Sequence, residues 1–176
     1  MRGAVKAFPG LRVTYVGADE AFDRILVHTD GPDDSGTYWR VDIPTGSAVE
    51  LGHDYPAIKA ADIGPVSMIR YKAGDGLEIH AVLTLPRGRD PKGLPLIVLP
   101  HGGPGSRDYP VFDWWAQALA SRGYAVLQPN FRGSTGYGAD FLAAGHGQWG
   151  KLMQTDVSDG VKALAERGVI DPRRVC

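Results

Sequence analysis

The sequence has a single cysteine, Cys176, and no hydrophobic stretch of the length that a membrane-spanning helix requires. One cysteine excludes an internal disulfide framework and a multi-cysteine metal site. The apolar runs fall well short of the roughly 18 residues that span a bilayer, and the first residues as printed lack the apolar core of a signal peptide. We therefore expect a cytoplasmic protein that does not associate with membranes.

Neither positive nor negative charge is in marked excess. The 176 residues include 19 Lys and Arg against 20 Asp and Glu, with no long run of one sign, so nothing favours nucleic acid or an anionic surface as a partner. The five histidines show no ligand spacing, and we expect no metal. Residues 145–150 match G-x-G-x-x-G, but they follow a helix-like piece instead of a strand, so we expect no dinucleotide and no other cofactor.

Residues 1–62 consist of short β-type runs separated by turn residues. The predicted strands are RVTYV (12–16), RILVHT (24–29), TYWRVDI (37–43) and AVEL (48–51). They predict an antiparallel sheet, and four strands make only about one blade of a propeller. We find no second copy of the pattern, so internal repetition does not demonstrate a propeller.

Residues 63–176 predict an α/β domain with a mostly parallel sheet. Asp75-Gly76 predicts a hairpin, and the continuous apolar run at 94–99 predicts a strand covered on both faces. A helix is expected over 112–122, with Trp115, Ala118 and Leu119 facing inward and Gly123 after its end, followed by a strand at 124–127. A second helix is expected over 155–167, with Thr155 as N-cap and Val157, Val161, Leu164 and Ala165 facing inward. The chain then enters a last strand.

The turn after the apolar strand is the first candidate for chemistry. His101-Gly102-Gly103-Pro104 leaves the strand with a pair of glycines, which exposes backbone N–H groups above the strand ends. Such a turn donates to the oxyanion in α/β-hydrolases, although it can also be a plain Gly-Pro turn.

An ordered series of segments then resembles one family. DGLEIHAVLTLP, LIVLPHGGPGS, RGYAVLQPNFRGSTGYG and WGKLMQTDVSDGVKALAERGVIDPRRV resemble the prolyl oligopeptidase family, particularly its acylaminoacyl-peptidase and dipeptidyl-aminopeptidase-like members. The resemblance implies the N-terminal half of an α/β-hydrolase domain, preceded in residues 1–62 by the end of a β-propeller. It also implies a serine peptidase that hydrolyses short peptides or acyl-peptides, with the N–H of Gly103, and Gly102 nearby, in the oxyanion hole.

The family's nucleophile is expected after the strand that begins DPRRV, in a Gly-x-Ser-x-Gly elbow, and its Asp and His come later still. Neither Ser106 nor Ser134 has that spacing, and we expect both in turns. We therefore expect residues 1–176 alone to be inactive and poorly soluble, and to self-associate or pair with a missing C-terminal half through an exposed strand edge.

Two other interpretations remain open: a non-catalytic remnant or interaction module, and another α/β-hydrolase such as a proline iminopeptidase, which shares HGGPG, or a carboxylesterase. Arg132 also has two interpretations. It either braces the loops around the site and contacts substrate, or it pairs with a carboxylate such as Asp140 or Asp156.

Overall fold

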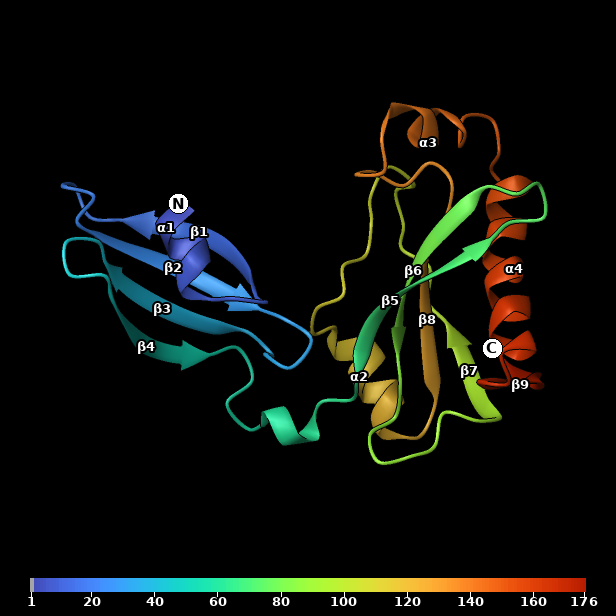
Figure 1. Cartoon of the computed structure of the whole chain (residues 1–176), viewed down its shortest axis with the longest axis horizontal. Coiled ribbons are helices and arrows are strands. Elements are labelled where there is room, and N and C mark those ends of the chain that lie inside the picture. The colour runs from blue at the N-terminus through green and yellow to red at the C-terminus, as the bar shows by residue number, and fades with distance from the viewer. Residues whose placement is uncertain (1) are drawn as a thin grey trace. The chain divides into compact units, whose positions relative to one another are not determined.

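The computed structural model describes residues 2–176, which divide into two compact units (Figure 1). The first holds the residues up to Ile63 together with Val111–Asp113, and the second holds Gly64–Pro110 and Trp114–Cys176. Among the described residues, no helix is long and apolar enough to cross a membrane.

The first unit is a four-stranded antiparallel sheet. Its strands β1 (Arg12–Ala18), β2 (Arg24–Asp30), β3 (Thr37–Asp42) and β4 (Ser47–His53) pair in chain order, which confirms the four predicted strands. A short helix, α1 (Arg2–Ala7), precedes them, and a 3₁₀ turn, η1 (Ala60–Asp62), follows. Phe8, Ile25, Val27 and Val41 form a small core on one face.

The second unit contains a mixed five-stranded sheet in the order β5-β6-β8-β7-β9. Its strands are β5 (Val66–Lys72), β6 (Glu78–Thr84), β7 (Leu94–Val98), β8 (Ala125–Asn130) and β9 (Ile170–Val175). The β5–β6 hairpin is antiparallel with Gly76 at φ +89°, as Asp75-Gly76 predicts. Strand β7 is parallel to both β8 and β9, so the carboxyl ends of all three lie at one edge of the sheet.

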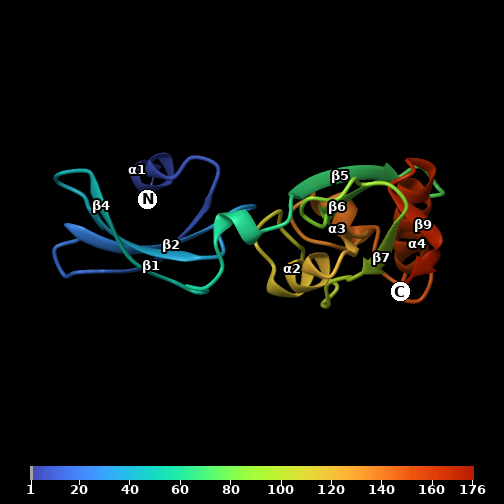
Figure 2. The same ribbon diagram turned by 90° about the horizontal axis from the view of Figure 1, so that it is seen from below.

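The three helices of the second unit are α2 (Trp114–Ser121), α3 (Ala139–Ala143) and α4 (Leu152–Glu166). All six residues of β8 are buried, and because successive side chains point to opposite faces, this strand is covered on both sides. Strand β7 has only Leu94 and Leu96 buried, so full coverage belongs to β8 and not, as expected, to β7. Figures 1 and 2 show α2 and α4 well apart from each other.

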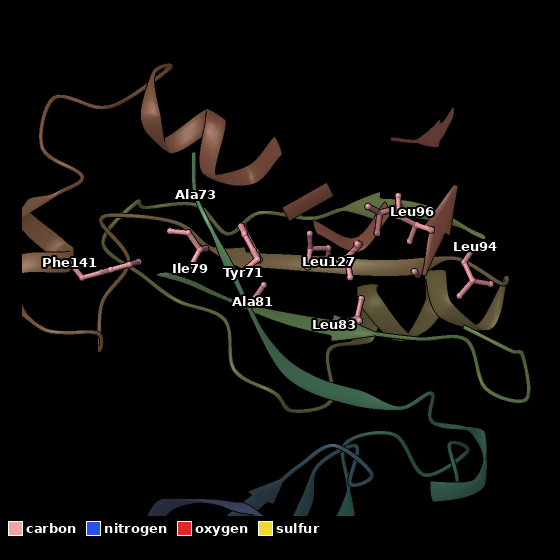
Figure 3. Close-up of a cluster of buried hydrophobic side chains, with 12 residues drawn as sticks. Tyr71, Ala73, Ile79, Ala81, Leu83, Leu94, Leu96, Leu127 and Phe141 are labelled. Atoms are coloured by element: carbon pink, nitrogen blue, oxygen red, sulfur yellow. The ribbon is translucent and has the colours of Figure 1, made fainter. Parts of the chain in front are cut away.

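Leu127 lies at the centre of the main apolar cluster (Figure 3). Around it lie side chains from the other strands and from α4, among them Tyr71, Ile79, Leu96 and Leu164. Since these residues come from elements on both sides of β8 in the sheet order, their packing holds the strands in register below the carboxyl edge.

The residues expected to face inward from the first helix are not the buried ones. In α2 the buried residues are Ala116, Gln117 and Ala120, whereas Trp115 and Ala118 are exposed, because the small alanines let the helix approach the sheet closely. Gly123 at φ +97° ends that helix as predicted.

Helix α4 begins at Leu152, so Thr155 is not its N-cap; the Thr155 hydroxyl donates to the carbonyl oxygen of Leu152 inside the helix. The buried residues of α4 are Met153, Asp156, Gly160 and Leu164, while Val157, Val161 and Ala165 are half-buried. Leu164 is thus confirmed as facing inward, and Val161 and Ala165 pack against the core, but the centre of the buried face lies nearer Asp156 and Gly160 than predicted.

Replacing Gly160 with alanine tests this packing. A Cβ added there would lie 2.8 Å from Tyr71 Cζ and Oη and 2.9 Å from Leu127 Cδ2. Gly160→Ala is expected to lower the free energy of unfolding by about 1 to 2 kcal/mol, since overpacking exceeds the helix-propensity gain of about 1 kcal/mol. Ser158→Ala, at an exposed position of the same helix, is the control and is expected to change it by less than about 0.5 kcal/mol. Thermal unfolding measures both, and a stabilised Gly160→Ala variant would contradict the packing.

Candidate active site

The candidate site lies at the edge where β7 and β8 end. Residues 99–108 leave β7 and residues 131–138 leave β8, and because the two strands are parallel and adjacent, both loops start at the same edge. His101, Gly102 and Gly103 belong to the first loop, which we call the oxyanion loop (101–108), and Arg132 belongs to the second.

Gly102 and Gly103 are exposed at this edge. Among the described residues, no acceptor is found for the backbone N–H of either glycine. Gly103 has a φ of +127°, a conformation that L-residues with a side chain rarely adopt. A Cβ there would lie 3.1 Å from the Gly105 nitrogen, so the turn requires glycine at this position.

A cleft of about 320 Å³ adjoins Gly103. Its lining is mostly apolar and includes Pro104 beside the turn, Phe131 from the second loop, and Met153 and Val157 from α4. Gly103, whose amide has no acceptor among the described residues, therefore lies at a concave and mostly apolar surface, which is the kind of surface that encloses a bound ligand.

His101 connects the two loops. Its Nε2 lies 2.9 Å from Ser134 Oγ and its Nδ1 lies 2.9 Å from the carbonyl oxygen of Gly102. The ring stacks on Phe131 with centroids 4.7 Å apart. Ser134 is fully buried and its hydroxyl donates to the carbonyl oxygen of Phe131 at 2.7 Å, which is the turn role expected for it and leaves it unlike an exposed nucleophile.

Arg132 is buried, and its side chain is ion-paired with two carboxylates. Nε and Nη2 donate to Asp156 at 2.8 and 2.7 Å, while Nη1 and Nη2 donate to Asp75 at 2.8 and 3.0 Å. The backbone N–H of Arg132 also donates to Asp156, at 3.0 Å. Of the two carboxylates considered, Asp156 and not Asp140 is the partner. A substrate contact by Arg132 stays a prediction, and these contacts do not favour it.

The electrostatics follow from these bonds. The hydrogen bonds that Arg132 donates to Asp156, and then those to Asp75, raise the pKa of the guanidinium, and the same bonds hold the pKa of Asp75 below its ordinary value. Burial, followed by the nearby Asp156, raises the pKa of Tyr71, whose hydroxyl donates to the carbonyl oxygen of Asp156 at 2.8 Å. Arg132 thus ties the second loop to α4 and to the β5–β6 hairpin.

Sequence reasoning missed Asp75 and Asn130. The sequence pattern places Asp75 only in a hairpin turn and gives Asn130 no role. Asn130 is fully buried and its side-chain amide bonds both backbone groups of Asp108. A polar amide at the end of a mostly apolar strand is a signal that could have identified it.

Comparisons with known proteins agree with this architecture. Residues 110–176 match the sequence profile of the Prolyl oligopeptidase family. The chain is 37% identical over 139 residues to dipeptidyl aminopeptidase BIII of Pseudoxanthomonas mexicana, covering 75% of this chain and 20% of that protein. It is 35% identical over 100 residues to the acylamino-acid-releasing enzyme of Mus musculus, covering 56% of this chain and 14% of that enzyme.

Among solved structures, a puromycin hydrolase is 32% identical and superposes with a TM-score of 0.74, over 87% of this chain and 24% of that one. The chain thus spans a quarter or less of the length of these relatives. The structural matches confirm the fold class: part of an α/β-hydrolase domain preceded by strands like those of a β-propeller.

Proposed function

We propose that the chain, whose residues 110–176 match the Prolyl oligopeptidase family, belongs to that family of serine peptidases and supplies the oxyanion turn of an enzyme that hydrolyses short peptides or acyl-peptides by acyl transfer. The observation that carries the proposal is the pair of exposed amides at Gly102 and Gly103, which have no acceptor among residues 2–176, together with the mostly apolar cleft that Gly103 lines.

In this reaction a general base takes the proton of a serine hydroxyl as its oxygen attacks the scissile carbonyl carbon, and the carbonyl oxygen takes up the electron pair of the broken π bond. The Gly103 N–H donates to that oxyanion, a contact worth about 3 to 4 kcal/mol of transition-state stabilisation. The amine then leaves with the proton that the base returns to it, and water hydrolyses the acyl-enzyme.

The nucleophile in this proposal comes from outside residues 1–176, which contain no Gly-x-Ser-x-Gly. The topology supports this arrangement. The N–H of Cys176 donates to the Leu96 carbonyl oxygen and the N–H of Val98 donates to the Cys176 carbonyl oxygen, so β9 ends beside β7. An elbow that follows β9 would face the oxyanion turn.

A fluorophosphonate probe tests the proposal. We expect it to label the complete protein that contains residues 1–176, and we expect that protein to hydrolyse peptide or N-acyl-peptide p-nitroanilides. Heat-denatured protein is the control for non-specific labelling, and residues 1–176 alone are expected to remain unlabelled.

Two results would contradict the proposal in different ways. A complete protein that is neither labelled nor active favours the interaction-module interpretation. Labelling of residues 1–176 that disappears in Ser134→Ala would place the nucleophile at Ser134.

A further inference from the structure

The oxyanion loop contains neither helix nor strand. One bond inside it runs from the Ser106 N–H to the Pro104 carbonyl oxygen, at 2.7 Å, and another joins His101 Nδ1 and the Gly102 carbonyl oxygen. The segment after β8 is a neighbour that bonds this loop at several points.

Asn130 holds the far end of this loop. Its Oδ1 accepts from the Asp108 N–H at 2.7 Å, and its Nδ2 donates to the Asp108 carbonyl oxygen at 3.0 Å and to Tyr137 Oη at 2.8 Å. The side chain is fully buried, and both of its N–H groups and its oxygen are used. Asn130 is the last residue of β8, so the loop end is bonded to the rigid central strand of the sheet.

Two further contacts hold the rest of the loop to the same segment. His101 Nε2 meets Ser134 Oγ at the loop's start, and the Thr135 N–H donates to the Ser106 carbonyl oxygen at 2.9 Å in its middle. The glycine amides lie between the first and second of these contacts. The Ser106 and Asp108 contacts together hold the loop on the side of Gly103 that leads away from β7, so loss of the Asn130 bonds weakens the support of that side.

We propose that Asn130 is a positioning residue for catalysis: it sets the position of the oxyanion turn by binding both backbone groups of Asp108. The inference rests on the proposed peptidase function. Asn130 does not touch the substrate in this account, and its effect reaches the reaction through the loop alone. An oxyanion donor must be placed to within a fraction of an ångström to act in the transition state, so loss of the Asn130 amide lowers turnover more than substrate binding.

The chain offers a matched control for the test. Gln117 of α2 is also a buried amide that binds both backbone groups of one distant residue: its Oε1 accepts from the Gly64 N–H at 2.8 Å and its Nε2 donates to the Gly64 carbonyl oxygen at 3.1 Å. Asn130→Leu and Gln117→Met are near-isosteric substitutions, and each removes one such pair of hydrogen bonds to the backbone. Both variants leave buried backbone groups unpaired and lose stability. Only the first acts on the oxyanion loop.

The experiment compares the two variants in the complete protein, with kcat normalised to the amount of enzyme titrated by fluorophosphonate. For Asn130→Leu we expect kcat to fall about 10- to 100-fold with KM changed less than about twofold. We expect the inhibition constant of a peptide aldehyde, which forms a tetrahedral adduct, to rise in parallel with the loss of kcat. Gln117→Met is expected to leave kcat and the aldehyde affinity unchanged while lowering the unfolding temperature.

The inference is overturned if Asn130→Leu keeps wild-type kcat and aldehyde affinity, or if Gln117→Met lowers them equally. If Asn130→Leu does not fold, Asn130→Asp replaces it. In that variant an oxygen still accepts from the Asp108 N–H, and the bond donated to the Asp108 carbonyl oxygen is lost. We therefore expect a smaller fall in kcat, again with KM changed little. A wild-type protein that turns over no peptide contradicts the proposed function instead, so the two failures are distinguishable.

Discussion

Replacing Gly103 with alanine is expected to lower kcat of the complete protein on the order of 100-fold, which is the effect of losing one oxyanion-hole donor. The methyl group would lie 3.1 Å from the Gly105 nitrogen and 3.3 Å from Ser106 Cβ, and φ of +127° is strained for any L-residue with a side chain. The turn must therefore rearrange, and its N–H moves away from the developing negative charge. Steady-state kinetics with a peptide p-nitroanilide measures the loss.

Gly105 provides the control for this substitution. No heavy atom lies within 4 Å of a Cβ placed there, and its φ lies outside the left-handed region. Gly105→Ala is therefore expected to retain activity close to that of the wild type, although it lies two residues away in the same turn. If Gly103→Ala turns over substrate as fast as Gly105→Ala, the Gly103 amide does not bind the oxyanion.

The location of the candidate site could be predicted from the sequence because local patterns determine it. A continuous apolar run that stops at Pro100 and opens into His101-Gly102-Gly103 indicates both a buried strand and a tight turn after it, and the structure places the turn at the end of β7. The alternation and turn residues of 12–53 likewise identify the four strands of the first unit.

The side chains that hold the turn in place could not be predicted, because their partners are distant in the sequence. Asn130 binds Asp108 across 22 residues, and Arg132 binds Asp75 across 57. Helical periodicity also places an aspartate on the outside of a helix by default. Asp156 faces inward because Arg132 offers it two N–H groups from the side chain and one from the backbone, and that partner rotates the expected face of α4.

The same buried pair leads to the largest expected effect on stability. Asp156→Asn is expected to lower the free energy of unfolding by about 3 kcal/mol, because it removes the fully buried one of the two carboxylates that the buried Arg132 guanidinium faces and leaves only the partly exposed Asp75. Glu166→Gln is the control, because it also replaces a carboxylate of α4 with an amide. The side chains of Glu166 and its ion-pair partner Lys162, 4.0 Å apart, are both exposed, so this substitution is expected to cost less than about 0.5 kcal/mol. Urea unfolding of the complete protein at neutral pH compares the two variants.

A double-mutant cycle separates loss of the pair from general disruption of the core. Arg132→Met alone leaves the fully buried Asp156 carboxylate without its guanidinium, so it too is expected to cost about 3 kcal/mol. In the double variant no buried charge remains at the site. Its loss of unfolding free energy is therefore expected to be smaller than the sum of the losses of the two single variants, by about 1 to 3 kcal/mol. Strict additivity would mean that each side chain stabilises the fold through its other neighbours, and that the ion pair does not join the second loop to α4.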